Sequence, residues 1–254
     1  MVLFMHTQHP SLGEKIAEQL VGRNLLGAEF PKVKSFQREV SNVGGTDMRT
    51  DFLIEHEDPT QLSRVLEVKT VVDTDYHVSA VPTLSLEDDN EKKKTTAASS
   101  KKKKKKKKQC LFTSDESPYD RTAIFPWGNS NQKGPDGEKV VSARAIKHVR
   151  EITKLVQSQR YAGTILFVVI RGDAAQFRPN YEACPSFAKY LQQAKNAGVQ
   201  ILAKQVTWGS SNTTTTNDND NNNEEKTEDE IMINDVRICY EGNLLDIQWP
   251  PEAV

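Results

Sequence analysis

The chain is poor in cysteine and has no long apolar run. Only three cysteines occur in its 254 residues, Cys110, Cys184 and Cys239, and none of them forms a CxxC pair. This spacing excludes a disulfide framework and a zinc knuckle, and it is typical of a reducing compartment. The longest later apolar run is ILFVVI at 165–170, which is far too short to span a membrane.

Motifs of secreted proteins and of several enzyme classes are missing as well. The first residues, MVLFMHTQHP, lack the apolar core of a signal peptide. No glycine-rich loop runs into Lys-Ser or Lys-Thr, which excludes a P-loop nucleotide site, and no GxSxG motif marks a serine hydrolase. We therefore expect an intracellular protein that does not bind membranes, in the nucleus or an organelle if the chain is eukaryotic.

Apolar residues are also scarce, at 36% of the chain, and two tracts account for much of the deficit. Residues 84–117 contain 11 lysines against 6 acidic residues, and residues 209–230 contain 1 lysine against 7 acidic residues. Both tracts are predicted to be disordered insertions, because they have too few apolar side chains to offset the entropy of ordering. Subtracting them from the totals of 34 basic and 35 acidic residues leaves 22 of each, which argues against a generally basic nucleic-acid-binding surface.

The lysine run at 101–108 allows two interpretations. Blocks of like charge often act as nuclear-localisation signals or as salt-sensitive phosphate-binding patches. The neighbouring TTAASS fits a repeat expansion in a tolerant loop equally well. Both interpretations stay open on sequence alone.

Hydrophobic periodicity predicts a mixed α/β protein. Helices are predicted over 11–21, over 142–159 with Ser142 as N-cap, and over 186–198 with Gly198 as the stop. Period-two alternation and apolar runs predict strands at 32–41, 48–57, 63–72, 164–170 and 199–208, and then a hairpin over 231–249 that turns at Glu241-Gly242-Asn243.

The order α-β-β-β-α-β-α-β indicates one domain, 1–254, built as an α/β sandwich with a mixed sheet. Short turn-rich gaps between the first three strands predict an antiparallel meander. The continuous apolar run at 164–170 predicts a strand that is buried on both faces.

Three charged residues on the predicted meander are candidates for a metal site. In LEVKT, Glu67 and Lys69 share one face of their strand, while Leu66 and Val68 point into the core. Asp51, in RTDFLIE, comes opposite Glu67 if the two strands pair. Two carboxylates suit Mg²⁺ or Mn²⁺, and a lysine beside them can orient a water nucleophile and stabilise charge on phosphorus. This set predicts phosphodiester hydrolysis; the alternative is a solvated ion pair on an ordinary strand face.

Several blocks, taken in their order and spacing, resemble the sugar fermentation stimulation protein family. The resemblance covers about residues 6–208 without the lysine-rich tract. It implies a restriction-endonuclease-like PD-(D/E)xK domain with the core order α-β-β-β-α-β. The family also carries a small barrel of OB type ahead of this domain, and we expect that barrel to be absent here. The blocks include REV at 38–40, RTDFLIE at 49–55, LEVKTV at 66–71, ARAIKHVREI at 143–152 and LFVVIRGDAAQFRP at 166–179.

The resemblance also implies roles for individual residues. Asp51 and Glu67 are expected to be the metal-binding carboxylates, and Lys69 the catalytic or phosphate-facing lysine. Glu39 in REV and Glu14 on the first helix are further candidate ligands.

Two of these assignments have competitors in the sequence. On the first helix Glu18 competes with Glu14 for the acidic position. On the helix over 142–159, His148 matches a position expected to contact nucleic acid, but a structural hydrogen bond is the alternative for a helical histidine. The full set expected to contact the nucleic-acid backbone is Arg49, Arg144, Lys147 and His148.

These expectations lead to competing function hypotheses. The first is a DNA-binding protein with a nuclease-like site that uses Mg²⁺ or Mn²⁺. The alternative is a non-catalytic DNA-binding regulatory protein that retains the nuclease fold, and a remnant scaffold with neither property is the third. Metal-dependent cleavage of nucleic acid distinguishes the first from the others.

Overall fold

The structure is a computed structural model that describes residues 11–75, 120–207, 230–233 and 236–250. The predicted insertions at 84–117 and 209–230 lie outside these residues, apart from Glu230, which begins a strand. Residue 110 and residues 101–108 are likewise outside the described part.

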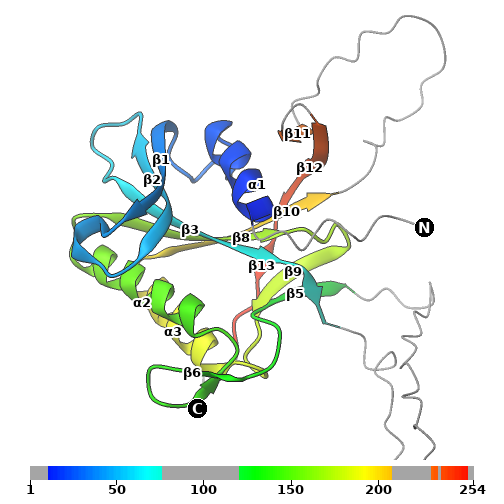
Figure 1. Cartoon of the computed structure of the whole chain (residues 1–254). Helices are drawn as coiled ribbons and strands as arrows, with labels where there is room; N and C mark the ends of the chain where they lie inside the picture. The colour runs from blue at the N-terminus through cyan, green and yellow to red at the C-terminus, as the bar shows by residue number, and fades with distance from the viewer. Residues whose placement is uncertain (1–10, 76–119, 208–229, 234–235, 251–254) are drawn as a thin grey trace, which may run out of the picture. The chain divides into compact units, whose positions relative to one another are not determined.

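A seven-stranded mixed sheet is the main element of the described chain (Figure 1). Its strand order is β1-β2-β3-β8-β10-β12-β11. Strands β1, β2 and β3 are antiparallel neighbours, and β8 lies parallel to both β3 and β10. The mixed α/β class and the mixed sheet are therefore confirmed. The bounds are β1 Val33–Ser41, β2 Arg49–His56, β3 Arg64–Val71, β8 Ala162–Val169, β10 Gln200–Thr207, β11 Glu230–Ile233 and β12 Val236–Leu244.

Helices cover both faces of this sheet. Helix α1 (Ser11–Gly22) lies on one face, and α2 (Ala143–Gln157) and α3 (Pro185–Asn196) lie on the other (Figure 1). Ser142 caps α2 as predicted, because its side chain accepts a hydrogen bond from the amide of Ala145. Among the residues that the structure describes, no helix combines the length and the apolar composition needed to cross a membrane.

The buried apolar side chains form two clusters, and alternate residues of β8 belong to each. Ile165, Phe167 and Val169 pack in the cluster that contains α2 and α3 side chains. Leu166 and Val168 pack in the cluster that contains α1 side chains. The strand is thus buried on both faces, as its continuous apolar sequence predicts.

Short strands extend the fold beyond the prediction. A second sheet has the order β13-β9-β5-β4, and β6 pairs with β7 in a separate hairpin. Most of these strands are too short for period-two alternation to appear, so the sequence patterns missed them. Their bounds are β4 Asp73–Thr74, β5 Arg121–Phe125, β6 Gln132–Lys133, β7 Lys139–Val140, β9 Ala174–Pro179 and β13 Asp246–Ile247, and a 3-10 turn, η1, spans Val43–Gly45.

The predicted hairpin turn at Glu241-Gly242-Asn243 is wrong. These residues belong to β12, which pairs antiparallel with β11; residues 234–235, between the two strands in sequence, lie outside the described part. A Cβ atom on Gly242 would meet the carbonyl oxygen of Gln205 at 2.9 Å, next to an irregularity in the β10–β12 register. The glycine therefore permits close backbone approach inside a strand and does not mark a turn.

Gly13 is where α1 packs closest to β3. A Cβ atom there would lie 1.8 Å from Thr70 Oγ1, whereas on Gly22 of the same helix it would meet nothing closer than 3.7 Å. We expect Gly13→Ala to destabilise the protein by about 1–3 kcal/mol through overpacking. Gly22→Ala is the matched control, since both substitutions gain helix propensity and only the first clashes. Urea denaturation measures both, and equal effects would contradict the prediction.

Candidate functional site

The candidate site lies where β2 and β3 separate. Their antiparallel ladder ends at the pair Phe52 and Leu66. Strand β2 nevertheless begins at Arg49, where it remains paired with β1, and β3 continues to Val71 along β8. Beyond Leu66, β3 is therefore paired on one side only, and its other side faces the start of β2.

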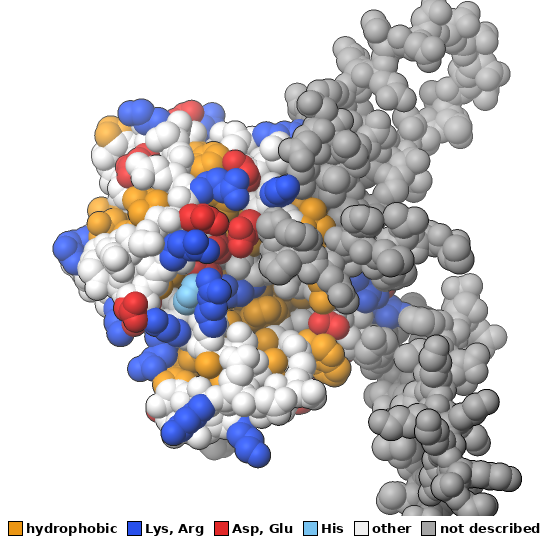
Figure 2. Space-filling view, viewed as in Figure 1, with side chains coloured by type: hydrophobic (Ala, Val, Ile, Leu, Met, Phe, Trp, Pro, Cys, Tyr) orange, Lys and Arg blue, Asp and Glu red, His pale blue; other side chains and the backbone are white. Residues whose placement is uncertain are grey.

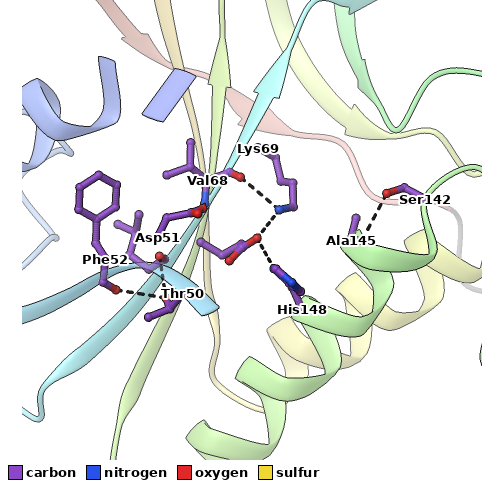
Figure 3. A network of polar contacts seen from close by, with 10 residues as sticks. Thr50, Asp51, Phe52, Val68, Lys69, Ser142, Ala145 and His148 are labelled. Carbon is purple, nitrogen blue, oxygen red and sulfur yellow. Dashed lines mark hydrogen bonds and ion pairs between the residues drawn. The ribbon is translucent and has the colours of Figure 1, made fainter. Parts of the chain in front are cut away.

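Side chains of β2 replace the missing strand pairing. Thr50 Oγ1 donates to the carbonyl oxygen of Leu66 at 3.1 Å, and Asp51 Oδ2 accepts from the amide of Val68 at 2.6 Å (Figure 3). These bonds satisfy the carbonyl of Leu66 and the amide of Val68. Without them, both groups would lack hydrogen-bond partners, because β3 is unpaired on this side. The bonds also fix the carboxylate of Asp51 beside β3.

Glu67 follows Leu66, the last residue of β3 that pairs with β2, and 2% of its side chain is exposed. Lys69 Nζ and His148 Nδ1 both contact Glu67 Oε1, the histidine at 2.5 Å (Figure 3). Lys69 Nζ also donates to the carbonyl oxygen of Val68 at 3.2 Å. The alternative of a solvated Glu67–Lys69 ion pair is thus wrong, because this pair is buried between β3 and α2.

The second carboxylate oxygen of Glu67 is the unusual atom of the site. Oε2 is buried and has no hydrogen-bond partner. A buried ionised oxygen without a partner is costly, so a bound cation or a proton donor would stabilise it. This observation fits a divalent ion between Glu67 and Asp51.

The protein supplies few ligands for such an ion. Within the described ranges, no group of three or more His, Cys, Asp or Glu side chains is placed to hold a metal ion. Asp51 and Glu67 would therefore be joined by water and substrate oxygens, a ligand set that suits Mg²⁺ because it retains several waters.

The pKa values of the two carboxyl groups move in opposite directions. Burial, followed by repulsion from Glu67, raises the pKa of Asp51 to about 6. Burial also opposes ionisation of Glu67, but Lys69 and His148 outweigh it and hold the pKa of Glu67 below its ordinary 4.5. At neutral pH Glu67 is ionised, while Asp51 still exchanges its proton near neutrality.

We expect Asp51→Asn to stabilise the metal-free protein at about pH 7.5 and to change little near pH 4. Folding raises the pKa of Asp51 from 3.8 to about 6, so the folded state binds this proton more tightly than the unfolded state. Stability is therefore greatest below the unfolded pKa and falls as the pH rises through the folded pKa, by roughly 3 kcal/mol in total. Asparagine stays neutral, and its amide oxygen can still accept from Val68.

Chemical denaturation in EDTA at both pH values measures this difference. The gain of Asp51→Asn over wild type should appear at the higher pH alone. A gain of the same size at both pH values would contradict a raised pKa for Asp51.

The structure distinguishes between the carboxylates of α1. Glu18 pairs with Arg38 at 2.6 Å. Glu14 lies close enough to Asp51 to raise the pKa of that residue further. Of the two competing helix positions, Glu14 is the one near the site.

Glu39, the other candidate ligand, pairs with Arg49 on the surface. The two side chains lie 3.5 Å apart and are 51% and 54% exposed. Glu39 has a φ of 53°, in the left-handed region that is uncommon for residues other than glycine. Its role as a metal ligand stays a prediction.

The predicted nucleic-acid contacts divide into exposed and buried residues. Arg49, Arg144 and Lys147 are exposed, and Lys147 pairs with Asp47 at 2.8 Å. His148 is 7% exposed and bonded to Glu67, so its expected contact with a nucleic-acid backbone is corrected to a contact inside the protein. On the face shown in Figure 2, a group of acidic side chains lies among Lys and Arg side chains.

Sequence reasoning missed the bond between His148 and Glu67. A signal was present, because His148 lies one turn from both Ala145 and Ile152, which face the core. A histidine on the buried stripe of a helix requires a polar partner inside the protein. The pattern did not identify which partner.

The family comparison covers one part of this site. A model for the sugar fermentation stimulation protein RE domain matches residues 135–212. The match contains α2, β8, α3 and β10, and so His148, but not Asp51, Glu67 or Lys69. This match is shorter than the expected range of 6–208. The β3–β8 pairing and the Glu67–His148 bond connect the matched segment to the segment that carries Asp51, Glu67 and Lys69.

Curated relatives match over short segments. The sugar fermentation stimulation protein homologues of Alkaliphilus metalliredigens and Geobacter sulfurreducens are 43% identical over 60 residues and 41% identical over 82 residues. The alignments cover 24% and 32% of this chain, and 25% and 30% of the relatives. The chain therefore spans less than a third of the length of these relatives.

One solved structure aligns over a longer stretch. It is Pyrococcus furiosus SfsA in complex with Ca²⁺, which aligns with 92% of this chain and 64% of its own, with a TM-score of 0.49 and 16% identity. The family model and the curated relatives confirm the resemblance to the sugar fermentation stimulation protein family.

Proposed function

We propose that this relative of the sugar fermentation stimulation proteins is a DNA-binding protein with a divalent-metal-dependent phosphodiesterase site of the PD-(D/E)xK type. The observation that carries the proposal is the carboxylate of Glu67, which is buried with one oxygen held by two donors and the other, Oε2, without a partner. Within the described residues, Glu67 Oε2 is one of four buried side-chain atoms without a hydrogen-bond partner, and of these it alone belongs to the set of Asp51, Glu67 and Lys69.

The element order supports the same reading. Helix α1, the antiparallel strands β1 to β3, α2 and the parallel strand β8 follow one another in the main layers of the fold. In this proposal Asp51 on β2 and Glu67 and Lys69 on β3 correspond to the Asp, Glu and Lys of this nuclease type. The β2–β3 ladder ends at Phe52 and Leu66, next in sequence to Asp51 and Glu67.

The residues have distinct tasks in the proposed reaction. Asp51 and Glu67 would hold Mg²⁺ or Mn²⁺, and when bound the ion supplies positive charge that polarises the phosphoryl oxygen and acidifies water. Lys69 Nζ, which contacts Glu67 and donates to the carbonyl oxygen of Val68 in this structure, would turn from Glu67 to place a second positive charge beside the scissile phosphate. There it stabilises the negative charge that develops during attack.

Exposed basic residues would hold the rest of the substrate. Arg49 and, on α2, Arg144 and Lys147 present cations that can contact successive phosphates. Such contacts fix the position of a nucleic acid without reading its sequence, and they weaken as salt rises.

Cleavage of supercoiled plasmid DNA by the full chain tests the proposal. We expect nicking with Mg²⁺ or Mn²⁺ and none in EDTA. Lys69→Ala should lower the rate by roughly 100-fold to 1000-fold, the usual cost of losing one preorganised donor. Lys34→Ala, which removes an exposed lysine of β1, is the matched control and should leave the rate unchanged. DNA binding without cleavage in either metal would support the non-catalytic alternative.

A further inference from the structure

We infer that His148 is a positioning residue: its Nδ1–H holds Glu67 Oε1 and thereby leaves Oε2 available for the cation. The inference rests on the proposed metal site and adds to it a residue from a different element. The contact is 2.5 Å long, and the two side chains are 7% and 2% exposed.

The ring of His148 is held by the helix that carries it. Helix α2 is capped by Ser142 and buries Ala145, Val149 and Ile152 against the sheet. His148 lies among these positions, so its Cα position and ring direction are set by core packing. Because core packing already restricts the side chain of His148, holding it in the hydrogen bond to Glu67 costs little further conformational entropy.

The chemistry of Glu67 and His148 determines which atom carries the proton in their hydrogen bond. An ionised carboxylate only accepts hydrogen bonds, so the ring nitrogen that faces Glu67 must be the donor. Nδ1 of His148 therefore carries a proton. Carboxylate ligands that are oriented by a fixed hydrogen bond bind metals more tightly, and removal of such a partner typically costs 10-fold to 100-fold in affinity.

The presence of two donors on one oxygen explains why the histidine is needed beside Lys69. The lysine has a flexible side chain that is 15% exposed, and in the proposed reaction it turns towards a phosphate. Oε1 would then lose one of its two donors. His148 keeps the carboxylate in the same orientation during that movement.

Two substitutions of similar polarity separate positioning from mere packing. The amide nitrogen of Asn overlays Nδ1 of histidine, whereas that of Gln overlays Nε2. His148→Asn should therefore retain most of the affinity for Mn²⁺, and His148→Gln should lose roughly 10-fold to 100-fold. Isothermal titration calorimetry with MnCl₂ on the full chain gives the affinities, and thermal melting without metal checks that both variants fold.

The outcomes are distinguishable. Equal Mn²⁺ affinity in wild type and both folded variants, or an equal loss in both, would overturn the positioning role while leaving the metal site in place. A wild type that binds no Mn²⁺ would overturn the proposed function. Nitrogen-15 NMR of the metal-free protein tests the hydrogen bond separately: a proton on Nδ1 of His148 supports its bond to Glu67, and an unprotonated Nδ1 overturns the positioning role.

Discussion

Glu67→Gln is expected to abolish detectable Mn²⁺ binding and to lower metal-dependent DNA cleavage by about 1000-fold or more. The substitution keeps the size of the side chain and an oxygen that His148 can bond, but it removes the negative charge that would hold the ion. Charge stabilisation by a catalytic metal contributes several kcal/mol, and each 1.4 kcal/mol is a factor of about ten in rate. Plasmid nicking and calorimetry measure the two effects separately.

The control for this substitution is Glu29→Gln. Glu29 is an exposed carboxylate that follows α1, so its loss should change neither metal binding nor cleavage. Glu67→Gln should also remain folded, because the buried Oε2 that it replaces has no partner to lose. Cleavage at the wild-type rate in folded Glu67→Gln protein would remove Glu67 from the site and with it the proposed metal.

Phe167→Ala is expected to lower the free energy of unfolding by about 4 kcal/mol. Phe167 is fully buried on β8 and stacks on Phe177, with ring centroids 4.3 Å apart. Its ring also contacts Phe125 and Phe187 at centroid distances of 5.6 Å and 6.4 Å. A cavity among large aromatic rings cannot close without moving α3 and the second sheet, so we expect little relaxation.

Phe167 also lies next to the candidate site, because it is the register partner of Lys69 across the β3–β8 ladder. Urea denaturation measures the loss of stability. Leu62→Ala, at a position 45% exposed between β2 and β3, should stay within about 0.5 kcal/mol of wild type. A loss below 1 kcal/mol for Phe167→Ala would contradict the packing described for the aromatic cluster.

Local patterns predicted the long elements well. The three helices and the strands β1, β2, β3, β8 and β10 begin and end within two residues of the predicted bounds. Periodicity identifies such elements because each extends over several repeats of its own pattern. The two-residue strands β4, β6, β7 and β13 have no repeat to detect, and the Gly242 region was misread because glycine marks turns and close strand contacts alike.

The candidate site was predicted in its composition but not in its environment. Alternation along a strand predicted Glu67 and Lys69 on one face, and the expected pairing of two strands added Asp51 as a candidate. The sequence did not predict the burial of Glu67, the lack of a partner for its Oε2, or the position of Glu14 rather than Glu18 near Asp51. Each depends on which other element packs against the strand.

The sequence by itself determined the three helices, the strands β1, β2, β3, β8 and β10, and the face of β3 that carries the charged residues, because these follow from contacts between near neighbours along the chain. The tertiary structure alone decided where the β2–β3 ladder ends, at Phe52 and Leu66, and so where Asp51 meets β3. It also decided that His148, 81 positions away, reaches Glu67. Burial and charge–charge distance act through space, and they set the opposite pKa directions of the two carboxyl groups only when the layers pack together.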